Sequence, residues 1–170
     1  LGMVNGVIPP EKVQDPQGII LGHQFTRDIC RTPMQWDSSR YSGFSEAEPW
    51  LPVNDDHEKV NVTSQQHDEH SMLNLYKSLI HIRKSSPALL SGSYESLDSD
   101  GNTFSFLRKA SIETMLIVLN FSDQPTPITI PYSGEIVLST TLRRTGSFNQ
   151  MIELESNEGL LIKVTGQTTR

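Results

Sequence analysis

Two arginines in one short polar segment have the types and the spacing to bind a polar ligand. Residues 26–44 are TRDICRTPMQWDSSRYSGF, in which Arg27 and Arg31 lie four positions apart with Asp28 between them. In a helical turn, side chains four positions apart lie on the same side. A guanidinium group donates two parallel hydrogen bonds to a carboxylate or to vicinal hydroxyls. These residues therefore predict either a clamp that holds the loop or a site for a polar ligand.

The neighbouring side chains offer less specific chemistry. Pro33 ends any helical turn, because the residue before a proline is disfavoured in the α region. The indoles of Trp36 and Trp50 can stack on a sugar ring or seal a core, and we expect the core role. Cys30 is the single cysteine, and we interpret it as a buried free thiol rather than as a nucleophile. No His or Cys cluster has metal-ligand spacing, so the sequence predicts no metal and no cofactor.

The elements that must position this segment belong to two parts of the chain, one without a sustained hydrophobic period and one with it. Residues 1 to about 68 are rich in Pro, Gly, Asn and Asp without a sustained period, which is typical of long loops with short helical turns. Apolar residues then recur at three and four positions, which predicts a helix over about 69–85 that ends before Pro87. Beyond Leu90 the period falls towards two, which predicts seven short strands of an antiparallel β-sandwich. The strands are expected at Ser93–Leu97, Thr103–Lys109, Thr114–Asn120, Pro127–Ile130, Glu135–Ser139, Met151–Leu154 and Gly159–Val164.

The composition narrows the function classes. The 170 residues include 14 basic and 20 acidic side chains, for a formal net charge of −6 at pH 7, and the signs are interspersed. This pattern argues against a nucleic-acid partner, because phosphate binding requires a concentrated basic patch. The longest apolar runs are too short to span a bilayer, and no signal segment opens the chain. Two sequons, at Asn61 and Asn120, would accept N-glycans in a secretory pathway.

The arginine segment also carries a family resemblance. Residues 27–37 are RDICRTPMQWD, followed by GFS at 43–45 and PWLPVN at 49–54. This run resembles the RDxxRTPMQWD, AGFS and PWLPVN signature of the α-glucosidases (maltases, oligo-1,6-glucosidases and sucrases) of the α-amylase superfamily. The LGM at 1–3 is similar to the end of the family's GEELGM, and the VLNFS at 118–122 to a strand of its C-terminal domain.

The resemblance implies a fold class of α/β plus β. Family members have a (β/α)8 barrel and a C-terminal antiparallel β-sandwich. Residues 1–90 would form the end of the catalytic barrel, the loop after strand 8 and helix 8, and residues 91–170 the sandwich domain. The chain would then be a C-terminal fragment that needs the upstream catalytic barrel of the same parent chain as its partner. Because active sites of such barrels lie in the loops after the strands, segment 26–44 would be an active-site loop.

The resemblance implies retaining glycoside hydrolysis by the parent, an exo-acting α-glucosidase of maltose- or sucrose-type oligosaccharides. The nucleophile and the acid of this mechanism are carboxyl groups. In the family they come from earlier strands, so we expect no catalytic residue here and an inactive isolated chain. Arg27 would contact the distal hydroxyls of the terminal glucose, beside an acidic partner from upstream. Arg31 and Gln17 are the other substrate-binding candidates, Arg31 also being a candidate loop clamp and Gln17 lying near acceptor-side specificity positions.

Other classes stay open at this point. Heavy-chain ectodomains of amino-acid transporters share the fold and an SPMQWD run but lack the pocket arginines, which this chain has. A plain carbohydrate-binding sandwich would need an exposed aromatic pair on adjacent strands, whereas we expect Phe104, Phe106 and Phe121 on the core face. The family and the sequons favour an extracellular protein, secreted or membrane-anchored, with the membrane a partner only if the parent is anchored.

Overall fold

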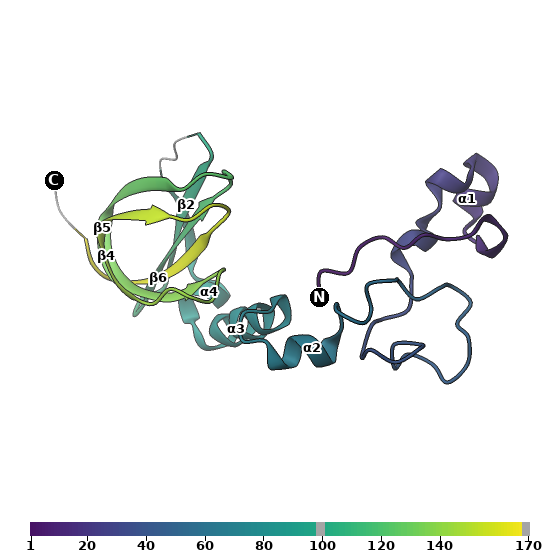
Figure 1. Cartoon of the computed structure of the whole chain (residues 1–170). Helices are drawn as coiled ribbons and strands as arrows, with labels where there is room; N and C mark the ends of the chain where they lie inside the picture. The colour runs from purple at the N-terminus through teal and green to yellow at the C-terminus, as the bar shows by residue number, and fades with distance from the viewer. Residues whose placement is uncertain (98–100, 168–170) are drawn as a thin grey trace. The chain divides into compact units, whose positions relative to one another are not determined.

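The computed structural model describes residues 1–97 and 101–167 of the chain. The chain divides into two compact units, Leu1–Asn74 and Leu75–Arg170. Figure 1 follows the first unit in purple and blue and the second in teal, green and yellow.

The first unit consists of loops that connect short helices, as its Pro, Gly, Asn and Asp content predicts. One such helix begins after Asn61, whose side-chain oxygen accepts a hydrogen bond from the backbone N–H of Ser64 at 2.8 Å. This bond satisfies one of the free N–H groups at the helix start. The elements of this unit are η1 (Pro10–Lys12), α1 (Pro16–Leu21), η2 (His23–Phe25), η3 (Arg27–Cys30) and α2 (Val62–His67).

The predicted long helix is present as α3 (Met72–Ser85). It begins three residues later than the expected boundary, because Ser71 Oγ accepts a hydrogen bond from the backbone N–H of Asn74 at 3.2 Å and acts as the cap. Pro87 ends it as expected and opens a new short helix, α4 (Pro87–Ser91), which is capped by Ser86. On α3, Leu75 is buried whereas Tyr76 and Ile80 are exposed, so part of its apolar surface faces solvent.

The second unit contains one antiparallel sheet, with six strands among the described residues rather than the seven expected. The expected strands at 127–130 and 135–139 are a single long strand. Its backbone stays extended across Pro131 because the pairing with β5 shifts register between Thr129 and Ser133, so the proline does not have to donate a ladder hydrogen bond. The strands are β1 (Ser93–Ser96), β2 (Thr103–Lys109), β3 (Thr114–Asn120), β4 (Thr126–Ser139), β5 (Gly146–Leu154) and β6 (Gly159–Gln167), in the order β1-β2-β3-β6-β4-β5.

The long strand β4 lets the sheet curl into the two facing layers of a sandwich. It pairs with β6 along one edge and with β5 along the other, and the strands wrap around a common interior (Figure 1). Gly134 lies where the backbone of β6 leaves no room for a side chain on β4, since a Cβ there would lie 2.2 Å from the backbone oxygen of Lys163. A residue with a side chain would therefore force the two strands apart.

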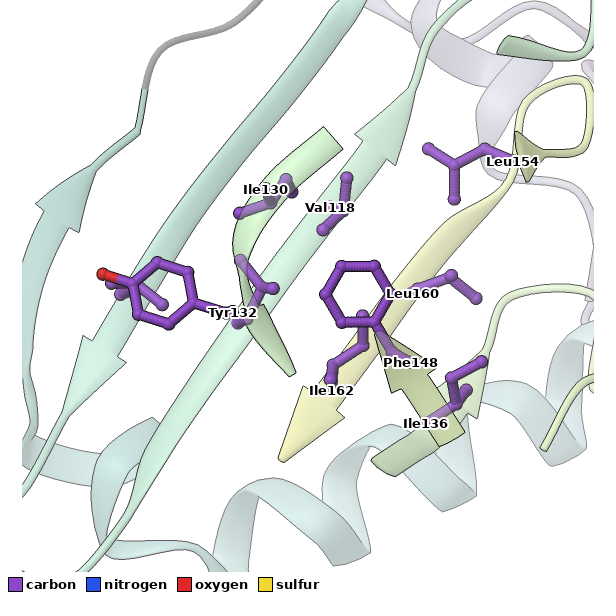
Figure 2. Close-up of a cluster of buried hydrophobic side chains, with 10 residues drawn as sticks. Val118, Ile130, Tyr132, Ile136, Phe148, Leu154, Leu160 and Ile162 are labelled. Carbon is purple, nitrogen blue, oxygen red and sulfur yellow. The ribbon is translucent and has the colours of Figure 1, made fainter. Parts of the chain in front are cut away.

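Alternating side chains of this curled sheet form one hydrophobic core. Phe148 lies among Leu160, Ile162 and Ile136 in Figure 2, and each of these four side chains is buried. On the opposite face of β3 and β6, Met115 and Leu161 pack with Ala88 of α4. The predicted succession of a helix and an antiparallel β-sandwich is therefore confirmed. The described core residues are Leu107, Leu116, Val118, Ile130, Tyr132, Ile136, Phe148, Leu154, Leu160 and Ile162.

The aromatic residues of the sandwich contradict the expected core face. Ser105 and Leu107 of β2 point inward, whereas Phe104 is exposed, and Phe121 is exposed beyond β3. The predicted alternation of side chains along β2 is correct, but the set of residues predicted to face the core is the set that faces away from it. Because side chains alternate along a strand, a shift by one residue exchanges the two faces. The Tyr94 and Phe106 rings lie 5.3 Å apart on the adjacent strands β1 and β2, and Tyr94 is 57% exposed.

Neither sequon presents an asparagine that could carry a glycan in this fold. Asn120 is buried, and its Nδ2 donates hydrogen bonds to the backbone oxygens of Gln124 at 2.9 Å and Glu155 at 2.8 Å. Asn61 is also buried, and its Nδ2 donates to His57 O at 2.9 Å. A glycan on either nitrogen would replace these bonds and require the side chain to leave the interior, so the sequons lend no support to secretion.

Candidate functional site

Two buried aspartates tie the arginine segment to an earlier loop of the first unit. Asp28 Oδ2 accepts hydrogen bonds from the backbone N–H groups of Gln14 and Asp15, each at 2.9 Å. In return, Asp15 Oδ2 accepts a hydrogen bond from the backbone N–H of Arg27 at 2.8 Å. Each carboxylate thus fixes the backbone beside the other one. We call Asp15, Arg27, Asp28 and Arg31 the charge cluster.

The same carboxylates hold the two guanidinium groups. Arg27 Nε lies 3.1 Å from both carboxylate oxygens of Asp15, and its Nη2 donates to Asp15 Oδ1 at 2.5 Å. Arg31 Nη1 donates to Asp28 Oδ1 at 3.1 Å and lies 3.9 Å from Asp15 Oδ1. The expected sharing of one side by Arg27 and Arg31 is therefore present, and the two positive charges of the cluster are balanced by two negative ones.

Burial separates the two kinds of side chain in the charge cluster. The side chains of Asp15 and Asp28 are fully buried, whereas those of Arg27 and Arg31 are 56% and 47% exposed. A buried carboxylate is stable only when it is paired and hydrogen-bonded, as both of these are. The cluster therefore presents guanidinium donors at the surface and keeps their counter-charges inside.

Local sequence explains why the segment takes this shape. The 3-10 helix η3 begins at Arg27 because Thr26 Oγ1 accepts a hydrogen bond from the backbone N–H of Asp28 at 3.2 Å. Pro33 follows it and prevents a longer helix. Gly18 of α1 allows the close approach of the two loops, since a Cβ at this position would lie 2.6 Å from the Thr26 Cβ.

The charge cluster lowers the pKa of both aspartates. Hydrogen bonds from the Arg27 side chain and then from its backbone N–H hold the pKa of Asp15 far below its ordinary value. Burial acts to raise the pKa of Asp28, but hydrogen bonds from the N–H groups of Asp15 and Gln14 outweigh it, so this pKa is also lowered. Both carboxyl groups are therefore ionised at neutral pH.

These lowered pKa values predict that acid weakens the first unit. The stabilisation by Asp28 is present above the pKa of an unfolded aspartate, about 4, and is lost as the pH falls from there towards the lower folded pKa. We therefore expect Asp28→Asn to lower the thermal midpoint of the chain at pH 7, and the difference from wild type to shrink below about pH 4. Calorimetry of both proteins across this range measures it. A difference that stays constant with pH would contradict the prediction, and Glu46→Gln, which removes an exposed carboxylate, serves as the control.

The structure places the remaining candidates apart from these contacts. Gln17 is exposed in the first turn of α1, and no hydrogen bond joins it to either arginine within the described residues. Cys30 is exposed, not buried as expected, because η3 turns its Sγ back towards Arg27 O at 3.3 Å. Within these 170 residues, Trp36 and Trp50 are 50% and 46% exposed, and Trp50 Nε1 donates to Lys12 O at 2.9 Å, so their core role stays a prediction about the whole parent.

Asp15 is the residue of the charge cluster that sequence reasoning missed. The expected acidic partner from upstream lies outside these 170 residues and stays a prediction, and within them the structure pairs Arg27 with a carboxylate twelve positions earlier. The sequence Asp15-Pro16 was misleading, because an aspartate directly before a proline is typical of a helix cap rather than of an arginine partner. In the structure Asp15 makes no side-chain cap bond to α1 and uses its oxygens for Arg27 instead.

No group of three or more His, Cys, Asp or Glu side chains in the part of the chain that the structure describes is arranged to hold a metal ion. None of the described helices is long and apolar enough to cross a membrane.

Comparisons with known proteins identify relatives of the chain. Residues 1–92 match the family model described as alpha amylase, catalytic domain. Over 100 residues the chain is 41% identical to "Probable oligo-1,6-glucosidase 3" of Bacillus subtilis (strain 168), which covers 58% of this chain and 18% of that protein. Over 118 residues it is 38% identical to an oligo-1,6-glucosidase of Halalkalibacterium halodurans, which covers 69% of this chain and 21% of that protein. The chain thus spans about a fifth of the length of these curated relatives.

The solved structures agree with the fold. The trehalulose synthase from Pseudomonas mesoacidophila MX-45 matches 97% of this chain and 34% of its own, with a TM-score of 0.82 and 28% sequence identity. The family model covers more than half of the 170 residues, including all of the arginine segment. The resemblance of the RDICRTPMQWD run is thereby confirmed, and the chain belongs to the alpha-amylase family, with α-glucosidases among its relatives.

Proposed function

We propose that this chain supplies a substrate-binding loop to an exo-acting, retaining α-glucosidase that releases terminal α-linked glucose from maltose- or sucrose-type oligosaccharides. The observation that carries the proposal is the held guanidinium of Arg27. A fully buried Asp15 engages its Nε and Nη2, while more than half of the side chain stays exposed. The relatives named as oligo-1,6-glucosidases support the reaction class.

The charge cluster suits a neutral, hydroxylated ligand. Sugar hydroxyls require fixed donors and acceptors rather than net charge, and the two arginines of the cluster are balanced by two aspartates. Asp15 occupies the Nε and Nη2 side of Arg27, so the Nη1 side is the one left to donate to a hydroxyl. Arg31 is held by Asp28 in a similar way, and we assign it to the acceptor side or to holding the loop.

The carboxylates of the charge cluster are unsuited to the chemistry itself. A general acid at a glycosidic bond needs a raised pKa, whereas the pKa values of Asp15 and Asp28 are lowered. Both are also fully buried and occupied by N–H donors, so neither can reach an anomeric carbon. We therefore assign the nucleophile and the acid to polypeptide outside these 170 residues.

Assays of two proteins test this proposal. The full-length enzyme that carries this chain is expected to release α-glucose from the non-reducing end of maltose, with the anomer identified by NMR during the reaction. The purified 170-residue chain is expected to release none, because it would lack both catalytic carboxyl groups. Turnover by the isolated chain, or an inverted product from the full-length enzyme, would contradict the proposal.

Two alternatives make different predictions. A transporter heavy-chain ectodomain would show no hydrolysis at full length and would copurify with a membrane transport subunit. A sugar-binding sandwich is favoured by the exposed Tyr94, whose ring lies beside the half-buried Phe106 on the adjacent strand. For that role, Tyr94→Ala should weaken binding of the protein to an α-glucan while leaving hydrolysis of maltose unchanged.

An extracellular location stays part of the proposal, and fractionation of the source cells tests it.

A further inference from the structure

We propose that Asp15 is the positioning residue of this site, and that it acts on the ligand only through Arg27. The inference rests on the proposed function, in which Arg27 is the substrate contact. It concerns a carboxylate that lies outside the RDICRTPMQWD run, twelve positions before Arg27.

Asp15 binds Arg27 at its backbone N–H and at its guanidinium group. Its Oδ2 accepts a hydrogen bond from the Arg27 backbone N–H at 2.8 Å, and its Oδ1 accepts one from Nη2 at 2.5 Å. Nε lies 3.1 Å from each oxygen, so the guanidinium plane is fixed by a fork rather than by a single bond. An arginine side chain is long and flexible, and fixing it before the ligand arrives removes the ordering cost from binding.

Asp15 is itself held from both sides. Its backbone N–H donates to Asp28 Oδ2 at 2.9 Å, and the proline that follows it restricts its backbone to the extended conformation that is observed, with φ −62° and ψ 122°. Thr26, the cap of η3, packs against Gly18 in the helix that Asp15 precedes. The carboxylate therefore has a defined position that does not depend on a bound ligand.

Burial excludes a direct role for Asp15. Its side chain is fully buried, and both of its oxygens accept hydrogen bonds from Arg27. Arg27 is the exposed member of the pair, at 56%. A ligand at this surface can reach the guanidinium group but not the carboxylate behind it.

The test is a double-mutant cycle in the full-length enzyme with maltose as the substrate. Asp15→Asn keeps the size of the side chain and one oxygen acceptor, but removes the charge and the fork. We expect it to lower kcat/KM by about tenfold to a hundredfold, because charge-assisted hydrogen bonds are worth this much, and to divide the loss between kcat and KM as Arg27→Ala does. In the Arg27→Ala background the same change should have little further effect. Glu48→Gln, which removes an exposed carboxylate partner of Lys12, is the matched control and should leave kcat/KM unchanged.

Chemical rescue supplies a readout that a purely structural role would not move. Added guanidinium ion should partly restore the activity of Arg27→Ala, because the Asp15 carboxylate remains to bind and orient it, whereas ammonium ion should restore less. The rescue should disappear in the Asp15→Asn, Arg27→Ala double variant. If Asp15→Asn fails to fold, the comparison of guanidinium with ammonium on Arg27→Ala alone decides the question, and equal or absent rescue overturns the inference.

The two proposals fail in different ways. If Arg27→Ala leaves kcat/KM unchanged, the proposed site is wrong and the role of Asp15 falls with it. If Arg27→Ala impairs hydrolysis but the effects of Asp15→Asn and Arg27→Ala simply add, or guanidinium rescue persists without Asp15, the site stands and only the positioning role is overturned.

Discussion

Replacing Arg27 with alanine is expected to lower kcat/KM of the full-length enzyme on maltose by about a hundredfold, the upper range for hydrogen bonds from a charged donor. The change removes the exposed guanidinium group and leaves the buried Asp15 carboxylate without its partner. If the contact between Arg27 and the terminal sugar is present in the bound substrate and strengthens in the transition state, its loss raises KM and lowers kcat together. Steady-state kinetics with purified enzyme measures both values.

Arg40→Ala is the control for the loss of an arginine from the same unit. Arg40 is exposed and lies over the Tyr41 ring at 5.0 Å, with no part in the charge cluster. We expect its loss to leave kcat/KM within about twofold of wild type, because exposed substitutions of this kind have small effects. Unchanged hydrolysis by Arg27→Ala, with the thermal midpoint retained, would remove Arg27 from the substrate site.

Replacing Phe148 with alanine is expected to destabilise the sandwich by about 3–5 kcal/mol, the cost of a large-to-small change in a closely packed core. The Phe148 side chain is only 2% exposed and lies between β4 and β6 side chains in the centre of the core (Figure 2). Its loss leaves a cavity whose walls belong to a hydrogen-bonded sheet and cannot collapse far. Urea unfolding of the 170-residue chain, followed by circular dichroism, measures the loss as a lower midpoint.

Met151→Ala on the same strand is the control for this change. Met151 is 70% exposed on β5, three positions from Phe148, so its truncation removes apolar contact without opening a cavity. We expect a change within about 0.5 kcal/mol. Equal losses for the two variants would show that β5 does not carry the core of this unit.

In the arginine segment, residue types and spacing predicted the local turn but not the partner of Arg27. The spacing of Arg27 and Arg31, and Pro33 after them, were sufficient to predict a short turn with both guanidinium groups on one side, and the structure has this arrangement. The identity of the partner was not predictable in the same way. Asp15 meets Arg27 only because Asp28 turns the loop back across thirteen residues, and no local pattern reports a contact made by loop closure.

The sandwich shows a different limit. Period-two alternation located most strands within a few residues, because burial on one face of a sheet imposes that period. It did not say which face is inside, and on β2 the smaller Ser105 and Leu107 are buried while Phe104 is exposed. The two short strands expected before and after Pro131 are one, because a register shift absorbs the irregular residues.

By itself, the sequence determined the family, the order of loop, helix and strands, and the segment in which Arg27 and Arg31 share one side. These follow from local propensity, from periodicity and from an eleven-residue run, all of which are properties of neighbouring residues. Only the tertiary structure decided which carboxylate holds Arg27, which faces of the strands are buried, and that the two sequon asparagines are enclosed. These depend on contacts between distant segments, whose free energy comes from burial and pairing that exist only once the chain has folded.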